Sequence, residues 1–186
     1  MRNPFIAGAL AAFALGGCGS VPKQPLPTVQ NVDLPRFMGD WYVIASIPTW
    51  IERDAWNAVE SYRLDSDGTI ATTFTFRKGG FDGPERRMTP RGFVVDRTSN
   101  AVWGMQFVWP IKADYRIVHL SDDYAQTVIA REDRDYVWIM ARTPQLAAAD
   151  YSRLTAFVAS LGYDASKLRK VPQRWPAQAV QQRATP

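Results

Sequence analysis

Short apolar runs separated by polar turns recur along most of this 186-residue chain, and this repetition constrains the fold more than any other feature. Within the runs, apolar and polar side chains tend to alternate, as they do in strands with one buried face. The pattern predicts eight successive strands, at residues 41–47, 59–64, 70–76, 92–95, 103–109, 115–120, 125–130 and 136–141. Strands with such spacing are typical of an all-β sandwich or an up-and-down barrel.

A helical period begins after the last predicted strand. Thr143 is a good N-cap, and Pro144 suits the first helical position. Apolar residues then recur at steps of four and three, which places them on one face of a helix. These residues are Ala147, Tyr151, Leu154, Val158 and Leu161. Gly162 can end the helix, so we expect one amphipathic helix packed on the wall of the β-structure.

The N-terminus has the three parts of an export signal. Arg2 precedes an apolar stretch, residues 5–15, that is too short to span a bilayer, and two glycines follow. The end of this segment, Leu15-Gly16-Gly17-Cys18, resembles the bacterial lipobox. The resemblance implies cleavage after residue 17 and lipidation of Cys18; the alternative is an ordinary signal peptide with a chance cysteine. Gly19 implies, by the same resemblance, sorting to the outer membrane of a two-membrane cell.

The remaining boundaries follow from composition. Residues 18–34 contain several prolines and predict an extended tether behind the lipidated cysteine. Residues 35–172 form the predicted domain, and residues 173–186 a flexible tail. Cys18 is the single cysteine, so no disulfide can form within the chain.

Composition also separates classes of partner. The formal net charge is +4, and the basic residues are scattered among acids rather than gathered in a stripe, which argues against nucleic acid. Seven Trp, seven Tyr and nine Phe favour a chain that encloses a hydrophobic cavity. We expect no cofactor and no metal, and the sequence leaves the oligomeric state open.

Local motifs distinguish a barrel from a sandwich. Gly39 and Trp41 match the G-x-W motif of lipocalins, and Arg142 matches the lone arginine of their third motif. Residues 122–124, with Asp123 and Tyr124, resemble the second motif, T-D-Y, although Asp122 replaces its threonine. Residues 133–144 and 162–168 resemble bacterial lipocalins of the outer-membrane lipoprotein type and apolipoprotein D. The resemblance covers residues 35–170.

The resemblance implies an eight-stranded antiparallel up-and-down barrel, open at one end, with one C-terminal α-helix packed on its wall. It also implies that Trp41 plugs the closed end and that Arg142 lies across its indole, in a cation–π contact. Gly39, Trp41, Asp123, Tyr124 and Arg142 are therefore expected to be structural residues.

Candidate ligand contacts come from alternation and from the family. Residues 103, 105, 107 and 109 share one face of a strand, and we predict an apolar wall there if that face points inward. The candidates are Phe74, Phe76, Trp103, Met105, Phe107, Tyr115 and Trp138. The alternative is that these side chains simply fill the barrel. Three arginines lie in or beside a loop, where they are expected either to meet an anionic headgroup or to form a solvated surface: Arg86, Arg87 and Arg91. Trp50 lies in the first loop, where it is expected to contact ligand or membrane.

These features favour a membrane-anchored carrier that binds, stores or transports a fatty acid, a lysophospholipid or a similar lipid. The alternative is a structural or protein-interaction lipoprotein of the envelope whose barrel is filled. An enzyme is disfavoured, because the single histidine, His119, is surrounded by no nucleophile motif and no metal-ligand spacing.

Overall fold

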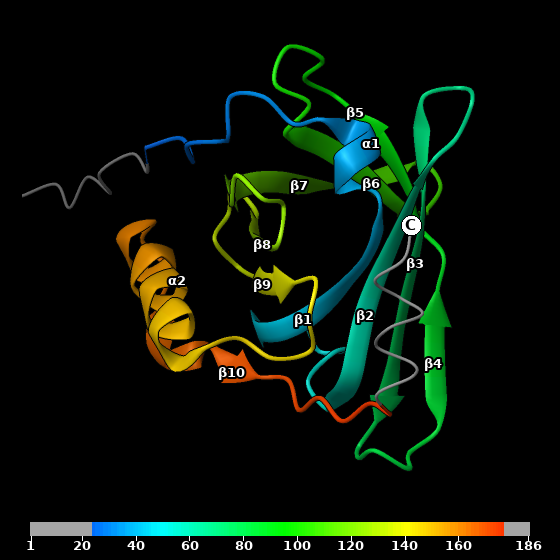
Figure 1. Ribbon diagram of the computed structural model, residues 1–186. Helices are drawn as coiled ribbons and strands as arrows, with labels where there is room; N and C mark the ends of the chain where they lie inside the picture. The colour runs from blue at the N-terminus through cyan, green and yellow to red at the C-terminus, as the bar shows by residue number, and fades with distance from the viewer. Residues whose placement is uncertain (1–23, 177–186) are drawn as a thin grey trace, which may run out of the picture.

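The computed structural model describes residues 24–176, so the predicted signal peptide, Cys18 and most of the predicted tail lie outside the described residues. The chain folds into one antiparallel sheet that closes on itself, because β1 pairs with both β2 and β9 (Figure 1). The barrel strands are β1 (Gly39–Ile47), β2 (Ala55–Leu64), β3 (Thr69–Lys78), β4 (Glu85–Met88), β5 (Arg91–Val94), β6 (Val102–Val108), β7 (Ile111–Leu120), β8 (Gln126–Ala130) and β9 (Val137–Ala141). The expected closed eight-stranded barrel is confirmed, with β4 and β5 together forming its fourth strand.

The fourth strand differs from the sequence prediction. β4 and β5 both pair with β3, and Thr89 and Pro90 separate them. Pro90 has no N–H to contribute to a ladder, which fits the interruption. Arg86 and Arg87 therefore lie on a strand rather than in the expected loop. The sequence pattern missed β4 because three of its four side chains are charged and exposed.

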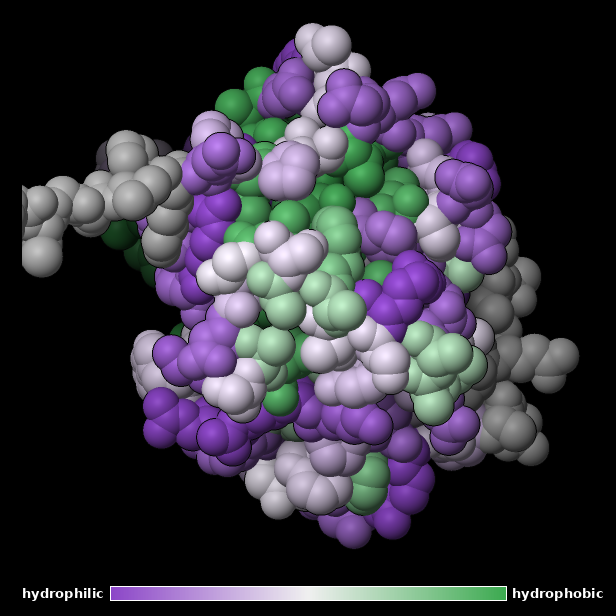
Figure 2. Space-filling model, turned by 90° about the vertical axis from the view of Figure 1, so that its left-hand side faces the viewer, coloured by the Kyte–Doolittle hydropathy of each residue, from purple (hydrophilic) through white to green (hydrophobic). Residues whose placement is uncertain are grey.

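Two layers of apolar side chains make up the core. One fills the barrel around Trp41 and Trp103, and the other lies between the outer wall and the helix α2 (Ala148–Ser160). Leu154 and Val158 of α2 are fully buried there, as the helical period predicts. Figure 1 shows α2 outside the ring of strands, and Figure 2 shows that face with hydrophilic residues around its margin. No helix within residues 24–176 is long and apolar enough to cross a bilayer.

The predicted start of α2 at Thr143 is wrong. The N-cap residue is Ala147, which makes no side-chain capping bond. The Thr143 hydroxyl instead donates to the carbonyl oxygen of Gln145 at 2.8 Å. That hydroxyl is thus engaged in a local bend, and the helix begins only after it.

The segment before β1 packs on the barrel instead of standing free. Leu26 and Val32 are buried, and the Val29 N–H donates to the Ile117 carbonyl oxygen at 3.1 Å. The short helix α1 (Leu34–Phe37) then lays Phe37 into the barrel interior. Residues 24–34, predicted as part of a tether, therefore belong to the folded domain.

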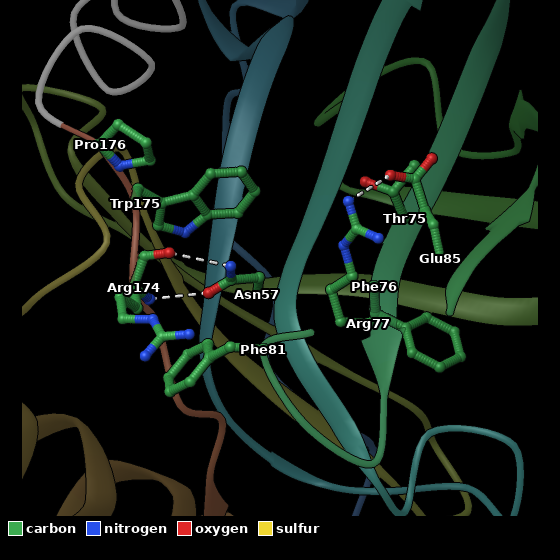
Figure 3. Close-up of a pocket in the computed structure, with 9 residues that line it drawn as sticks. All are labelled: Asn57, Thr75, Phe76, Arg77, Phe81, Glu85, Arg174, Trp175 and Pro176. Carbon is green, nitrogen blue, oxygen red and sulfur yellow. Dashed lines mark hydrogen bonds and ion pairs between the residues drawn. The ribbon is translucent and has the colours of Figure 1, made fainter. Parts of the chain in front are cut away.

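The chain after α2 also returns to the barrel. A 3-10 turn, η1 (Ala165–Lys167), leads to β10 (Arg169–Lys170), which pairs with β1. Beyond it, the Asn57 side chain donates to the carbonyl oxygen of Arg174 and accepts from its N–H, at 2.9 and 2.7 Å (Figure 3). The first residues of the predicted flexible tail are thus fixed to β2.

Candidate ligand-binding cavity

One end of the barrel is closed by Trp41 and Arg142. The Arg142 guanidinium carbon lies 3.9 Å from the centre of the Trp41 indole, and the indole N–H donates to the Phe37 carbonyl oxygen at 2.9 Å. This is the contact that the resemblance implies, and such a cation–π pair contributes about 1–2 kcal/mol when desolvated. Gly39 has φ +91°, and a Cβ there would lie 3.3 Å from Arg142 Nη1, so glycine suits this position.

Aromatic side chains fill the barrel next to this closed end. The rings of Trp103 and Tyr115 stack with their centres 4.9 Å apart. The hydroxyls of Tyr62 and Tyr115 are 2.8 Å apart and hydrogen-bonded, and Phe37 packs against Trp103. All are buried. They form a solid floor, so a ligand can occupy only the other half of the barrel.

A cavity of about 620 Å³ opens at that other end. Its size lies within the range of small-molecule sites, roughly 300–1,000 Å³. Side chains from the β1–β2 loop, the fourth strand, the β6–β7 hairpin and the β8–β9 loop surround it. The lining residues are Thr49, Trp50, Ile51, Glu52, Arg87, Met88, Thr89, Pro90, Phe107, Val108, Ala113, Arg131, Tyr136 and Trp138. This mixture of apolar walls with a few polar groups suits an amphiphile.

Few charged groups face the cavity. Glu52 accepts a hydrogen bond from the Trp138 indole N–H at 3.1 Å, and burial raises the pKa of its carboxyl above the ordinary value. Arg131 is paired with Asp135 at 2.9 Å, whereas Arg87 is exposed at the mouth. The inner part of the cavity is thus closer to neutral, and the exposed guanidinium of Arg87 stands at its entrance.

The comparisons with known proteins agree with this architecture. The family profile described as "Lipocalin-like domain" matches residues 32–173. The chain belongs to the lipocalin family. It is 29% identical to "Outer membrane lipoprotein Blc" of Escherichia coli K12, over 91% of this chain and 96% of that one. It is 31% identical to "Temperature-induced lipocalin-1" of Arabidopsis thaliana, over 81% and 84%. It is 26% identical to bovine apolipoprotein D, over 89% of both chains.

Solved structures show the same fold. Insecticyanin from the tobacco hornworm Manduca sexta superposes with a TM-score of 0.63 at 16% identity, covering 83% of this chain and 87% of the other. At that identity the likeness concerns the fold alone.

This lipocalin places the predicted ligand contacts at different depths. Phe107 and Trp138 line the cavity. Trp103 and Tyr115 lie in the aromatic floor, while Phe74, Phe76 and Met105 are buried in the barrel interior without lining the cavity. Trp109, on the same predicted face, is 82% exposed at the β6–β7 hairpin. The alternation thus identified interior positions but not which of them border a void.

Most of the residues that loops contribute to the cavity could not be predicted from the sequence pattern. Ile51, Glu52 and Arg131 come from loops, to which no alternation applies. Ala113 lies two residues before a predicted strand, and Tyr136 is the first residue of another, where its aromatic ring was the one available signal. Trp50, which the sequence placed in the first loop, does line the cavity.

The three arginines considered as contacts for an anionic headgroup also lie at different places in the barrel. Arg87 borders the cavity, whereas Arg86 lies exposed on β4. Arg91 donates to the Thr69 hydroxyl at 2.7 Å, next to the β2–β3 turn at the closed end. One of the three is therefore placed to meet a headgroup.

The second motif is a structural turn. Asp123 accepts from the Ser121 hydroxyl at 2.6 Å and from the Ala125 N–H at 3.0 Å. The Tyr124 hydroxyl accepts from the Asp33 N–H at 2.9 Å, and its ring stacks under Arg36. These contacts join the β7–β8 turn to α1 across the closed end.

His119 lies outside the barrel. Its ring packs 5.5 Å from that of Phe157 on α2, and burial lowers its pKa. Residues 24–176 contain no group of three or more His, Cys, Asp or Glu side chains arranged to hold a metal. Two smaller hollows, of about 230 and 360 Å³, share no lining residue with the cavity at the open end; the first is bounded by charged side chains such as Arg77 and Glu85 (Figure 3).

Proposed function

We propose that this protein is a lipid-anchored lipocalin of the outer membrane that binds, stores or transports a hydrophobic small molecule such as a fatty acid or lysophospholipid. The observation that carries the proposal is the open cavity of about 620 Å³ above the aromatic floor. A barrel filled by its own side chains would have favoured a structural or protein-interaction role instead.

The energetics of such binding are reasonable. Burying about 300 Å² of acyl chain at ~25 cal/mol per Å² contributes roughly 7 kcal/mol. The loss of translational and chain entropy offsets part of this, so the dissociation constant is expected in the micromolar range or weaker. We propose binding rather than catalysis, and the packing of the single histidine against α2, not in the cavity, supports this.

The membrane anchor is part of the same proposal. Cys18 follows a lipobox-like segment, and the relatives from Escherichia coli and Citrobacter freundii are named outer membrane lipoproteins. We infer that acyl groups on Cys18 hold the barrel at the outer membrane, which contains lipids that could serve as ligands. Several acyl chains together anchor far more firmly than one.

A titration tests the binding role. The Cys18→Ser protein is titrated with lysophosphatidylcholine and with palmitate. This variant carries no acyl groups on residue 18 that could compete with the added ligand for the cavity. Trp50 and Trp138 line the cavity, so tryptophan fluorescence reports occupancy. We expect saturation in the micromolar range.

A matched pair of variants locates the site. Ala113→Phe places a ring in the cavity and should weaken binding about tenfold or more, since ~1.4 kcal/mol of lost contact is a factor of ten. Ala149→Phe makes the same change on an exposed position of α2 and should bind as the parent does. Absence of any saturable response at tens of micromolar, or equal binding by both variants, would refute the proposal.

A further inference from the structure

We propose that the open end of the barrel docks on the bilayer that holds the anchor, with exposed apolar side chains of the β1–β2 loop and the β6–β7 hairpin inserted among the lipid headgroups. The proposal rests on the anchoring at Cys18 proposed above. It adds an orientation and a contact surface, and so a direct route between the cavity and the bilayer.

The contact surface, here called the mouth patch, consists of Trp50, Ile51, Phe107, Val108, Trp109 and Ile111. Trp50 and Trp109 are 79% and 82% exposed. Of the seven exposed large hydrophobic side chains in the described residues, six belong to this patch, and Val95 lies at the closed end. Such a concentration at one end of a barrel marks an interaction surface rather than chance exposure.

The composition of the mouth patch fits a bilayer. Tryptophan prefers the boundary between headgroups and acyl chains, because its ring is apolar and its N–H is polar. The exposed cations Arg53 and Arg87 lie on or beside the elements that carry the patch. Each basic side chain near an anionic leaflet strengthens binding.

The path of the N-terminal segment supplies an independent argument. Arg134 Nη2 donates to the Gln24 carbonyl oxygen at 2.6 Å, and the Leu26 N–H donates to Glu132 at 3.1 Å. Both partners belong to the β8–β9 loop, whose Arg131 lines the cavity. Gln24 is therefore at the open end. From there the chain runs down the wall to Asp33, whose N–H donates to the Tyr124 hydroxyl at the closed end.

Covalent geometry then limits the orientation. Cys18 lies six residues before Gln24, so the two are at most about 20 Å apart. The ten residues from Gln24 to Asp33 span the barrel wall from the open to the closed end. A membrane anchor at Cys18 thus keeps the mouth within reach of the bilayer, while the closed end lies farther from the anchor along the chain.

The test uses side chains that do not line the cavity. The Cys18→Ser protein, which lacks the anchor, is mixed with vesicles of phosphatidylethanolamine and phosphatidylglycerol, and bound protein is measured by flotation. Replacing Trp109 and Ile111 together, W109S/I111S, should lower vesicle binding about tenfold or more, because binding scales with inserted apolar area. Val95→Ser removes a comparably exposed side chain at the closed end and should leave vesicle binding unchanged.

Two readouts keep docking separate from ligand binding. In solution without vesicles, W109S/I111S should bind lysophosphatidylcholine as the parent does, because neither side chain borders the cavity. Equal vesicle binding by the parent and W109S/I111S, or an equal loss in Val95→Ser, overturns docking even if ligand binding stands. Sedimentation showing a dimer without vesicles that W109S/I111S abolishes overturns it too, since the patch would then join two copies. Vesicle binding without any ligand response would refute only the carrier function.

Discussion

Glu60 is the residue whose surroundings least suit its charge. It is 2% exposed on β2, opposite Trp41 and Phe74, and its Oε2 has no hydrogen-bond partner within the described part of the chain. Burial raises the pKa of its carboxyl well above the ordinary 4.5, and the nearby Glu52 raises it further. The fold therefore favours the neutral, protonated acid.

This buried acid predicts a pH-dependent cost. Below pH 4.5 the carboxyl is protonated in both the folded and the unfolded protein, so its burial lowers the stability little. Above it the unfolded chain releases the proton while the folded chain retains it, so stability falls as the pH rises. Glu60→Gln should remove this pH-dependent loss of stability. The free energy of unfolding of the variant, relative to that of the parent, should therefore increase with pH above 4.5, by at most ~1.4 kcal/mol per pH unit. Urea unfolding between pH 4 and 8 measures it.

The control is Glu85→Gln, the same chemical change on an exposed strand position. Its stability relative to the parent should vary much less with pH. A difference between Glu60→Gln and the parent that stays constant from pH 4 to 8 would show that Glu60 is not held protonated.

Among the elements, two irregular strands depend on one side chain from the C-terminal segment. The register of β1 shifts between Val43 and Ala45, and that of β2 shifts between Trp56 and Val59. Bulges of this kind leave backbone groups outside the ladder. The Gln173 side-chain amide donates to the Val43 and Ala58 carbonyl oxygens, at 2.8 and 3.0 Å. The residues after β10 thus complete the hydrogen bonding of the barrel wall.

Gln173→Ala should accordingly destabilise the fold by about 1–3 kcal/mol, because two partly buried carbonyls lose their donor. Gln30→Ala serves as the control, since Gln30 is exposed and, among residues 24–176, its side chain bonds only to the Thr28 carbonyl oxygen. Its effect should stay within about 0.5 kcal/mol. Chemical denaturation measures the free energy of unfolding of both variants. If Gln173→Ala is as stable as Gln30→Ala, Gln173 does not have this structural role.

On the scale of the whole molecule, Arg142 joins segments far apart in the sequence at the closed end. Its guanidinium donates to the carbonyl oxygens of Met38, Asp40 and Tyr124, among others, at 2.8, 2.9 and 3.4 Å. Burial lowers its pKa to about 10, so it remains charged at neutral pH. One side chain therefore links α1, β1, the β7–β8 turn and the end of β9.

Arg142→Lys should lower the free energy of unfolding by about 2–4 kcal/mol, since an ammonium cannot reach the same spread of carbonyls or cover the Trp41 ring as a plane. Arg63→Lys, an exposed arginine paired with Asp65, should cost less than about 1 kcal/mol. Ligand affinity of the folded Arg142→Lys protein should not change, because the cavity is at the opposite end. A variant as stable as the parent would contradict the closing role.

Much of the fold could be predicted from the sequence, because local patterns carry it. Seven of the eight predicted strands coincide with barrel strands. The remaining one, residues 92–95, corresponds to β5 but not to β4. β4 escaped because its exposed charges produce no alternation. The packed segments before β1 and after β10 escaped because prolines and polar residues resemble a tether, and their bonds are to distant strands.

The sequence by itself determined the succession of strands, which side chains share a strand face and, through Gly39, Trp41 and Arg142, the family. Only the tertiary structure decided where the void lies. Trp103 and Phe107 share one face of β6, about 13 Å apart, yet one is in the floor and the other at the mouth. Alternation has a period of two and carries no information about depth. Depth depends on how all strands and loops meet, and a cavity is the space that their side chains leave unfilled.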